Sequence, residues 1–217
     1  CRIMGYEIID QSNFYIPTLE KNMNETLSKP GLKSINLPLG EVSVTRKVKA
    51  LDIIIRSCSS VNMLTQSKKR IFDKNKIDYT LRSINSILRS VNYSKNYYSN
   101  LDIRITVVDH NSSEENLTKI SDLLKSSSLP FTLLNLDLAE FDGKIKKTNE
   151  KNEKVSQNQI SNMSNIYKSL LLSKISKDLI YFVEDDYVHE LDSITEMIFT
   201  YERIASLTNK ELVICPT

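Results

Sequence analysis

A chain of 217 residues is long enough for one good-sized domain with a continuous hydrophobic core. Its 29 basic and 27 acidic residues leave a formal charge of +2, which argues against a nucleic-acid-binding protein, because such proteins concentrate far more basic charge. Only 4 Gly and 5 Pro are present, so a linker-dominated chain is excluded. No apolar run approaches the roughly 20 residues of a membrane span, and we expect no transmembrane segment.

The ends of the chain and its cysteines lead to two further expectations. The sequence begins with Cys1 rather than Met and stops at Thr217, just after a strand-like run, so we expect a fragment of a longer protein. No signal peptide is visible. The three cysteines cannot all pair and form no CxxC motif, which favours a reduced, cytoplasmic location.

The first 50 residues show no regular pattern. Prolines and glycines recur between residues 17 and 40 and interrupt any long element. The mixed run Glu41–Thr45 predicts at most a short edge strand. We therefore interpret residues 1–50 as an N-terminal extension or the tail of an upstream region, and residues 51–217 as the main domain.

From residue 51 onwards, short apolar runs alternate with amphipathic segments. Runs rich in β-branched residues predict strands at Leu51–Ile55, Ile103–Val108, Phe131–Leu136, Leu179–Val183 and Leu212–Ile214. Apolar residues at helical spacing predict helices within 81–91, 117–124, 160–171 and 191–204. A capping-box pattern, Ser112–Glu115, precedes the second helix, and the polar residues 142–158 predict a mobile surface loop.

This alternation of strands and helices predicts the fold class. Parallel strands need long crossovers, and a helix packed right-handedly on the sheet is the usual connection. We therefore expect an α/β domain with a doubly wound, mostly parallel sheet. In such sheets ligands bind beyond the carboxyl ends of the strands, near the point where strand order reverses. The residues that directly follow each strand are therefore the candidates for a site.

The acidic triplet Glu184, Asp185 and Asp186 follows the fourth strand and is the sharpest of these signals. Three adjacent carboxylates repel one another, and a hard divalent cation removes that cost. Mg²⁺ or Mn²⁺ prefers one or two carboxylates together with phosphate oxygens. In an extended segment Glu184 and Asp186 share one face and Asp185 takes the other. The alternative is a solvated acidic turn at the amino end of a helix.

Three other residues that follow strands are weaker candidates. Asp109 follows the second strand and can accept a hydrogen bond from a nucleobase, or it can serve as a turn residue beside Ser112. Ser57, after the first strand, offers a hydroxyl and a backbone N–H to a nucleotide, as any such loop does. His189 lies close to the triplet and can bind metal, although an exposed histidine beside a helix start is the commoner case.

In chain order, three segments resemble landmarks of GT-A type glycosyltransferases, especially those of family 2. The segments are Ile53–Ser59, Val107–Ser112 and Leu179–Asp186, and the resemblance covers roughly residues 51–216. In that family the landmarks are the first-strand loop, the acidic residue after the second strand and the DxD-type metal motif. The resemblance implies a metal-dependent glycosyltransferase that moves a sugar from a nucleoside-diphosphate sugar to a hydroxyl of a glycan, lipid or protein acceptor.

Carried over residue by residue, the resemblance implies that Ser57, Asp109 and Asp185 contact the nucleotide sugar. Asp186 would be the direct metal ligand, with Glu184 beside it, and the cation would be Mn²⁺ or Mg²⁺. The triplet departs from the family pattern by having Glu rather than Asp at its start, and His110 stands where a second acidic residue is common. From the helix before the fourth strand only Asn165 is carried over. The general base of the family lies farther along than Thr217.

Two alternatives stay open at this point. A nucleotidyltransferase would use the same metal for a nucleoside triphosphate, but it usually has a glycine-rich, basic loop after the first strand, and Arg56–Ser59 is poor in both features. A non-catalytic α/β module would use the acidic cluster merely to bind ions. A receiver-like module also needs an acidic cluster after the first strand, where none is present.

Overall fold

The computed structural model describes residues 34–36, 40–59, 75–148 and 150–215. The chain divides into two compact units, one formed by residues 49–89 and 100–191 and the other by the remaining residues. Much of the predicted N-terminal region, residues 1–33 and 37–39, lies outside the described residues. None of the helices described is long and apolar enough to cross a membrane.

The first unit is built on a four-stranded sheet. Its strands are β3 (Ala50–Ser57), β4 (Asp102–Asp109), β5 (Phe131–Asn135) and β6 (Leu179–Glu184). They lie in the order β5-β4-β3-β6, and every pair is parallel. The chain therefore adds strands to one side of β3 and then crosses to its other side for β6. The strand order reverses between β3 and β6, which is where such sheets bind ligands.

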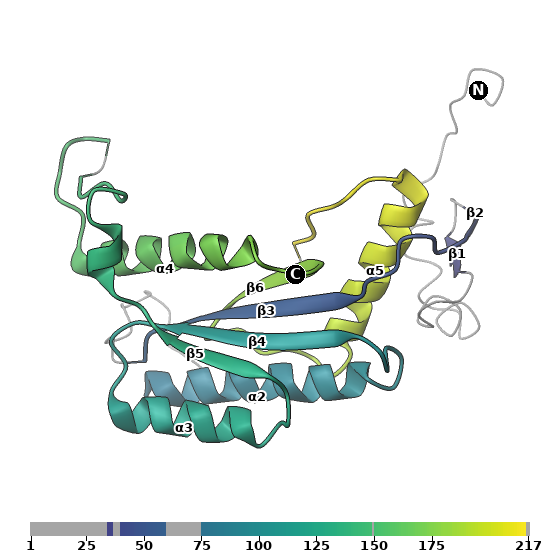
Figure 1. Cartoon of the computed structure of the whole chain (residues 1–217), viewed down its shortest axis with the longest axis horizontal. Coiled ribbons are helices and arrows are strands. Elements are labelled where there is room, and N and C mark those ends of the chain that lie inside the picture. The colour runs from purple at the N-terminus through teal and green to yellow at the C-terminus, as the bar shows by residue number, and fades with distance from the viewer. Residues whose placement is uncertain (1–33, 37–39, 60–74, 149, 216–217) are drawn as a thin grey trace. The chain divides into compact units, whose positions relative to one another are not determined.

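Helices cover both faces of this sheet, as Figure 1 shows. One face carries α2 (Lys76–Ser94), of which residues 76–89 belong to this unit, and α3 (Glu114–Lys125). The other face carries α4 (Gln157–Ser173), which contacts β3 and β4, and the short 3-10 helix η4 (Leu138–Phe141). The predicted doubly wound α/β fold is confirmed.

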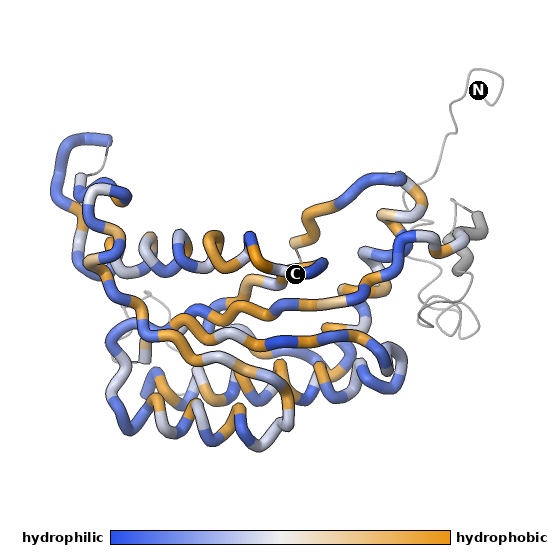
Figure 2. The backbone as a smooth tube through the Cα atoms, viewed as in Figure 1, coloured by the Kyte–Doolittle hydropathy of each residue, from blue (hydrophilic) through white to orange (hydrophobic). Residues whose placement is uncertain are grey.

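The core of the sheet unit follows from β-branched residues in the central strands. Ile53 and Ile55 of β3 are fully buried, as are Ile84 and Ile87 of α2. On the α4 side the buried cluster consists of Ile54, Val108, Leu136, Phe141 and Ile145. Figure 2 shows hydrophobic colour along the central strands and alternating colour along α2 and α3. The two faces of β3 are therefore both buried, as a parallel sheet covered by helices requires.

The second unit contains the hairpin β1 (Ser34–Asn36) and β2 (Gly40–Val42) and the helix α5 (Ser193–Thr208). The buried Glu202 carboxylate accepts a hydrogen bond from Val48 N at 2.8 Å, and the Ser206 hydroxyl accepts from the backbone N–H groups of Thr45 and Arg46. Burial raises the pKa of the Glu202 carboxyl. Residues 45–48 are thus held along α5.

Three local predictions need correction. Leu212–Ile214 is not a strand, because residues 211–215 have no regular structure and Val213 is fully exposed rather than paired. The N-cap of α3 is Ser113, which accepts from Asn116 N, while Ser112 is used elsewhere. The polar stretch is also shorter than predicted, since Ser156 forms a capping box with Gln159 and α4 begins at Gln157.

Candidate functional site

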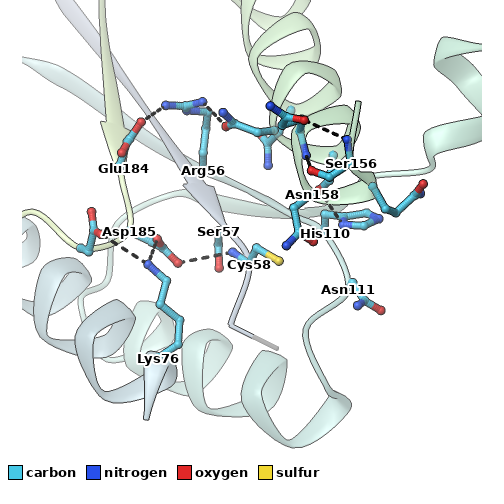
Figure 3. Close-up of a pocket in the computed structure, with 16 residues that line it drawn as sticks. Arg56, Ser57, Cys58, Lys76, His110, Asn111, Ser156, Asn158, Glu184 and Asp185 are labelled. Atoms are coloured by element: carbon cyan, nitrogen blue, oxygen red, sulfur yellow. Dashed lines mark hydrogen bonds and ion pairs between the residues drawn. The ribbon is translucent and has the colours of Figure 1, made fainter. Parts of the chain in front are cut away.

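A cavity of about 630 Å³ lies at the carboxyl ends of the central strands (Figure 3). The register places Ser57 beside Asp109 and Arg56 beside Glu184, so the ends of β3, β4 and β6 meet at one edge. Ser57, Cys58, His110 and Asn111 line the cavity at the ends of β3 and β4, and the other lining residues form two sets. The charged wall consists of Arg56, Lys76, Glu184, Asp185 and Asp186. The amide wall consists of Ser156, Gln157, Asn158, Gln159, Ser161, Asn162 and Asn165.

Glu184 forms an ion pair with its sheet neighbour Arg56. One Arg56 amino group, Nη2, donates to Glu184 Oε1, and the other, Nη1, donates to Asn162 Oδ1 at 3.0 Å. The guanidinium therefore bridges the end of β6 and the second turn of α4, as the dashed lines of Figure 3 show. Because both amino groups are engaged, Arg56 is fixed across the cavity before any ligand arrives.

Asp185 is buried, with 6% of its surface exposed. Its Oδ1 accepts from Lys76 Nζ at 2.6 Å, and its Oδ2 accepts from the Thr80 hydroxyl at 2.9 Å and from Cys58 N at 3.3 Å. These contacts satisfy a carboxylate that would otherwise be costly to bury. Asp185 thus ties the start of α2 to the ends of β3 and β6.

Asp186, like Glu184, is an exposed carboxylate of the charged wall. Its side chain is 45% exposed, and Lys76 Nζ lies 3.7 Å from its Oδ2, which is an ion pair but too long for a hydrogen bond. Glu184 and Asp186 are exposed and Asp185 is buried, as the alternation predicted, but β6 ends at Glu184 and residues 185–186 form a turn, so that Lys76 contacts both Asp185 and Asp186. Asp186 therefore has room and lone pairs for a cation.

Asp109 lies at the same edge of the sheet but is not among the residues that line the cavity. It is fully buried, and its two oxygens accept from the Ser112 hydroxyl at 2.6 Å and from Ser112 N at 3.1 Å. Burial raises the pKa of the Asp109 carboxyl, although the Ser112 hydrogen bonds oppose this shift. Its contacts are those of a turn residue that shapes the loop 110–112. Ser57 is buried and does line the cavity.

The two histidines have different surroundings. His110 lines the cavity, and its Nδ1 lies 2.7 Å from the Ser161 hydroxyl of α4. Burial lowers the pKa of the His110 imidazole, while the Asp109 charge opposes this. His189 does not line the cavity; its Nε2 lies 2.8 Å from the Tyr181 hydroxyl, and its backbone N–H donates to Ser86. His189 therefore packs near β6 and α2 rather than joining the triplet.

The amide wall was not predicted as a unit. Asn158, Ser161, Asn162 and Asn165 are spaced so that they share one face of α4, the face toward the cavity. Asn165, the member that the sequence had suggested, is buried and its Nδ2 donates to Val108 O at 2.8 Å. The sequence does show Gln and Asn residues at helical spacing in this segment. The same pattern is typical of the solvated first turns of an ordinary helix, so it does not indicate a site.

Lys76 was also missed by the sequence analysis. It is the first residue of α2 and contacts Asp185, 109 positions away in the sequence. Across the described residues, no three His, Cys, Asp or Glu side chains converge as a preformed metal site. The exposed carboxylates at the cavity are Asp186 and Glu184, and Glu184 is paired with Arg56, so these two residues alone do not complete the coordination of a hard cation.

Comparisons with known proteins add little to this geometry. No family model matches the chain, and no curated protein matches it. A solved structure of the galactosyltransferase LgtC in complex with donor and acceptor sugar analogs matches at 15% identity, with a TM-score of 0.34. The match covers 67% of this chain and 41% of that chain. A similarity this weak carries no argument about activity.

Proposed function

We propose that this chain is the donor-binding part of a metal-dependent glycosyltransferase of GT-A type, which takes a nucleoside-diphosphate sugar. The observation that carries the proposal is a single cavity at the strand-order reversal with one charged wall and one neutral, amide-rich wall. A nucleoside-diphosphate sugar has the same two parts, an anionic diphosphate and a neutral sugar rich in hydroxyls. The acceptor is a hydroxyl of a glycan, lipid or protein.

The charges of the cavity support the need for a divalent cation. The charged wall carries two cationic and three anionic side chains, so a diphosphate on its own would meet an excess of negative charge. Asp186, with Glu184 beside it, would hold Mn²⁺ or Mg²⁺, and this ion would neutralise charge that develops on the departing diphosphate. Arg56 and Lys76 face the same space and favour an anionic group there.

The amide wall supports a sugar as the transferred group. An amide side chain offers both donors and acceptors, which suits hydroxyl groups that act as both. Gln157 and Asn158 are exposed on the first turn of α4 and line the cavity. We propose that these side chains orient the sugar, while Ser57 at the end of β3 and His110 and Asn111 after β4 receive the nucleoside.

A thermal-shift screen tests this function. Uridine, guanosine and thymidine diphosphates are added with and without Mn²⁺, and the triphosphates are included to detect a nucleotidyltransferase. One diphosphate with Mn²⁺, at about 100 times its Kd, should stabilise the chain by about 2.7 kcal/mol, which raises Tm by about 5–10 °C. Asp186→Ala should abolish the metal-dependent part of the shift.

The matched control is Asp122→Ala. Asp122 is an exposed carboxylate near the carboxyl end of α3, where it pairs with Lys125, and it does not line the cavity. This variant should keep the full shift. If no nucleotide raises the Tm of the parent protein in the presence of Mn²⁺ or Mg²⁺, the proposed donor site is wrong.

A further inference from the structure

Lys76 occupies a position in the cavity that helix stability does not explain. It is the first residue of α2, where the exposed N–H groups of a helix carry partial positive charge and a cation is disfavoured. Its side chain is nevertheless only 13% exposed, and it lines the cavity. A lysine in this place needs a compensating anion, and the buried carboxylate of Asp185 supplies it.

The contacts of Lys76 leave its ammonium group turned toward the cavity. Within the described part of the chain, Nζ donates one hydrogen bond, to Asp185 Oδ1 at 2.6 Å, and lies 3.7 Å from Asp186 Oδ2. An ammonium group carries three protons. Arg56 also keeps N–H donors that the described residues do not use, but its guanidinium is planar and its two amino groups are tied to Glu184 and Asn162, so the directions of its remaining donors are set by these contacts. The ammonium group of Lys76 has two protons that no described residue uses, and it can orient them toward a ligand by rotating about its terminal bond.

We propose that Lys76 binds the diphosphate of the donor and that Asp185 is the positioning residue that holds it there. This inference rests on the proposed function. It gives Asp185 a different role from that of a direct contact to the nucleotide sugar. Asp185 is itself fixed by the Thr80 hydroxyl and by Cys58 N, so it cannot turn to meet a ligand without breaking three contacts. Asp186 keeps the task of holding the cation.

In this proposal Lys76, Asp185 and Asp186 have different roles at adjacent positions. Lys76 Nζ lies between Asp185 and Asp186, so a phosphate oxygen that meets the ammonium also lies next to the carboxylate that holds the divalent ion. A phosphate oxygen that reaches Nζ replaces the long contact to Asp186 with a charge-assisted hydrogen bond. The nucleoside and the sugar, which carry no such charge, gain nothing from Lys76.

The test uses a variant in which the buried pair is replaced as a whole. Lys76→Met combined with Asp185→Asn removes both charges with little change in volume, so that no unpaired charge stays buried. The matched control is Lys125→Met with Asp122→Asn, which removes an exposed ion pair of the same charge types from α3. Lys76→Arg, which keeps the charge, is the conservative variant. Circular dichroism and Tm establish that each variant is folded.

Isothermal titration calorimetry with excess Mn²⁺ measures Kd for the nucleoside diphosphate that stabilises the parent, for its nucleoside and for inorganic pyrophosphate. In the double variant, binding of the diphosphate and of pyrophosphate should weaken about 10- to 100-fold, while binding of the nucleoside stays the same within about twofold. Lys76→Arg should bind both ligands more tightly than the double variant does, but less tightly than the parent. A merely structural role for the pair would move all three affinities together.

The failures of the two proposals are distinguishable. If the parent binds a nucleoside diphosphate and the double variant binds it equally well, the role of Lys76 is wrong and the donor site stands. If pyrophosphate binds in a Lys76-dependent manner but no nucleoside diphosphate binds more tightly than pyrophosphate, the role of Lys76 stands and the donor function is wrong. If the parent binds neither ligand, both are overturned.

Discussion

The two walls of the cavity differ in how far their side chains are already engaged with one another. In the charged wall, Arg56 is bonded to Glu184 and Lys76 to Asp185, so most of the charges are fixed by neighbours. In the amide wall, the inner residue Asn165 is buried and bonded to β4, whereas Gln157 and Asn158 are exposed on the first turn of α4. The other members of the amide wall are also held, because Asn162 accepts from Arg56, Ser161 contacts His110, and Ser156 and Gln159 form the capping box. The difference between the walls therefore lies in Gln157 and Asn158, whose exposed side chains have room to adjust.

This difference matches what each wall would have to recognise. A phosphate group carries concentrated charge in a fixed geometry, and donors that are oriented in advance bind it without further ordering. Sugar hydroxyls rotate and act as donors or acceptors, so mobile amide groups can follow them. Substitutions in the charged wall should therefore lower the free energy of unfolding, whereas substitutions of the exposed amides Gln157 and Asn158 should change ligand affinity alone.

The largest expected effect is on stability, in the variant Asp185→Ala. Removing this carboxylate leaves the ammonium group of Lys76 and the hydroxyl of Thr80 without their shared acceptor in a buried place. We expect the free energy of unfolding, measured by urea denaturation, to fall by about 3–5 kcal/mol. The exposed control Asp122→Ala should barely change it. Equal unfolding midpoints for the two variants would show that the charged wall is not preorganised.

A smaller effect is expected on affinity, in the variant Asn158→Ala. Asn158 is exposed and lines the cavity, so its removal should leave the free energy of unfolding unchanged. If Asn158 orients the sugar as proposed, its removal should weaken binding of the nucleoside-diphosphate sugar about 2- to 10-fold, with no change for the diphosphate alone. Calorimetry with both ligands measures this difference. Asn85→Ala, an exposed change on α2 outside the cavity, is the control.

An equal loss for the sugar nucleotide and for the diphosphate in Asn158→Ala would place this residue on the nucleotide instead. It would also remove the distinction between the walls, because both would then act on the anionic part of the ligand. The ratio of the two affinities is therefore the decisive quantity, rather than either Kd alone.

The sequence was sufficient for the sheet because its determinants are local. The runs around Ile53 and Val107 are apolar and β-branched, and the helical segments between them are long enough for right-handed crossovers. Once the strands are parallel, their carboxyl ends share an edge, so Ser57 and Glu184 had to lie near one another. The predicted strand at Leu212–Ile214 is wrong because a short apolar run needs a neighbour to pair with, which the local pattern does not reveal.

The site was only partly predictable because its contacts are long-range. The acidic triplet is visible in the sequence, but the partners that distinguish its members are not. Lys76 is 109 positions from Asp185, and Arg56 is 128 positions from Glu184. Asp109 shows the opposite situation. Its hydrogen-bond donor, Ser112, is only three positions away, so a turn between the two residues could be predicted from the sequence. Local alternatives were visible, and distant partners were not.

The smallest expected effect concerns His110, which connects the loop after β4 to Ser161 of the amide wall. Burial lowers the pKa of its imidazole below the ordinary value of 6.5, so the unfolded chain takes up this proton at a higher pH than the folded chain does. The stability that this group contributes is therefore fully present above pH 6.5 and is lost as the pH falls through the unfolded pKa toward the lowered folded pKa.

In His110→Asn, unfolding curves between pH 7 and pH 5 should show a smaller loss of stability than in the parent. His189, whose pKa burial also lowers, remains in both proteins, so its contribution cancels in the difference between the curves. An imidazole NMR signal of His110 that titrates at or above pH 6.5 would contradict this, and would mean that the amide wall is more open to water at this point than its contact with Ser161 implies.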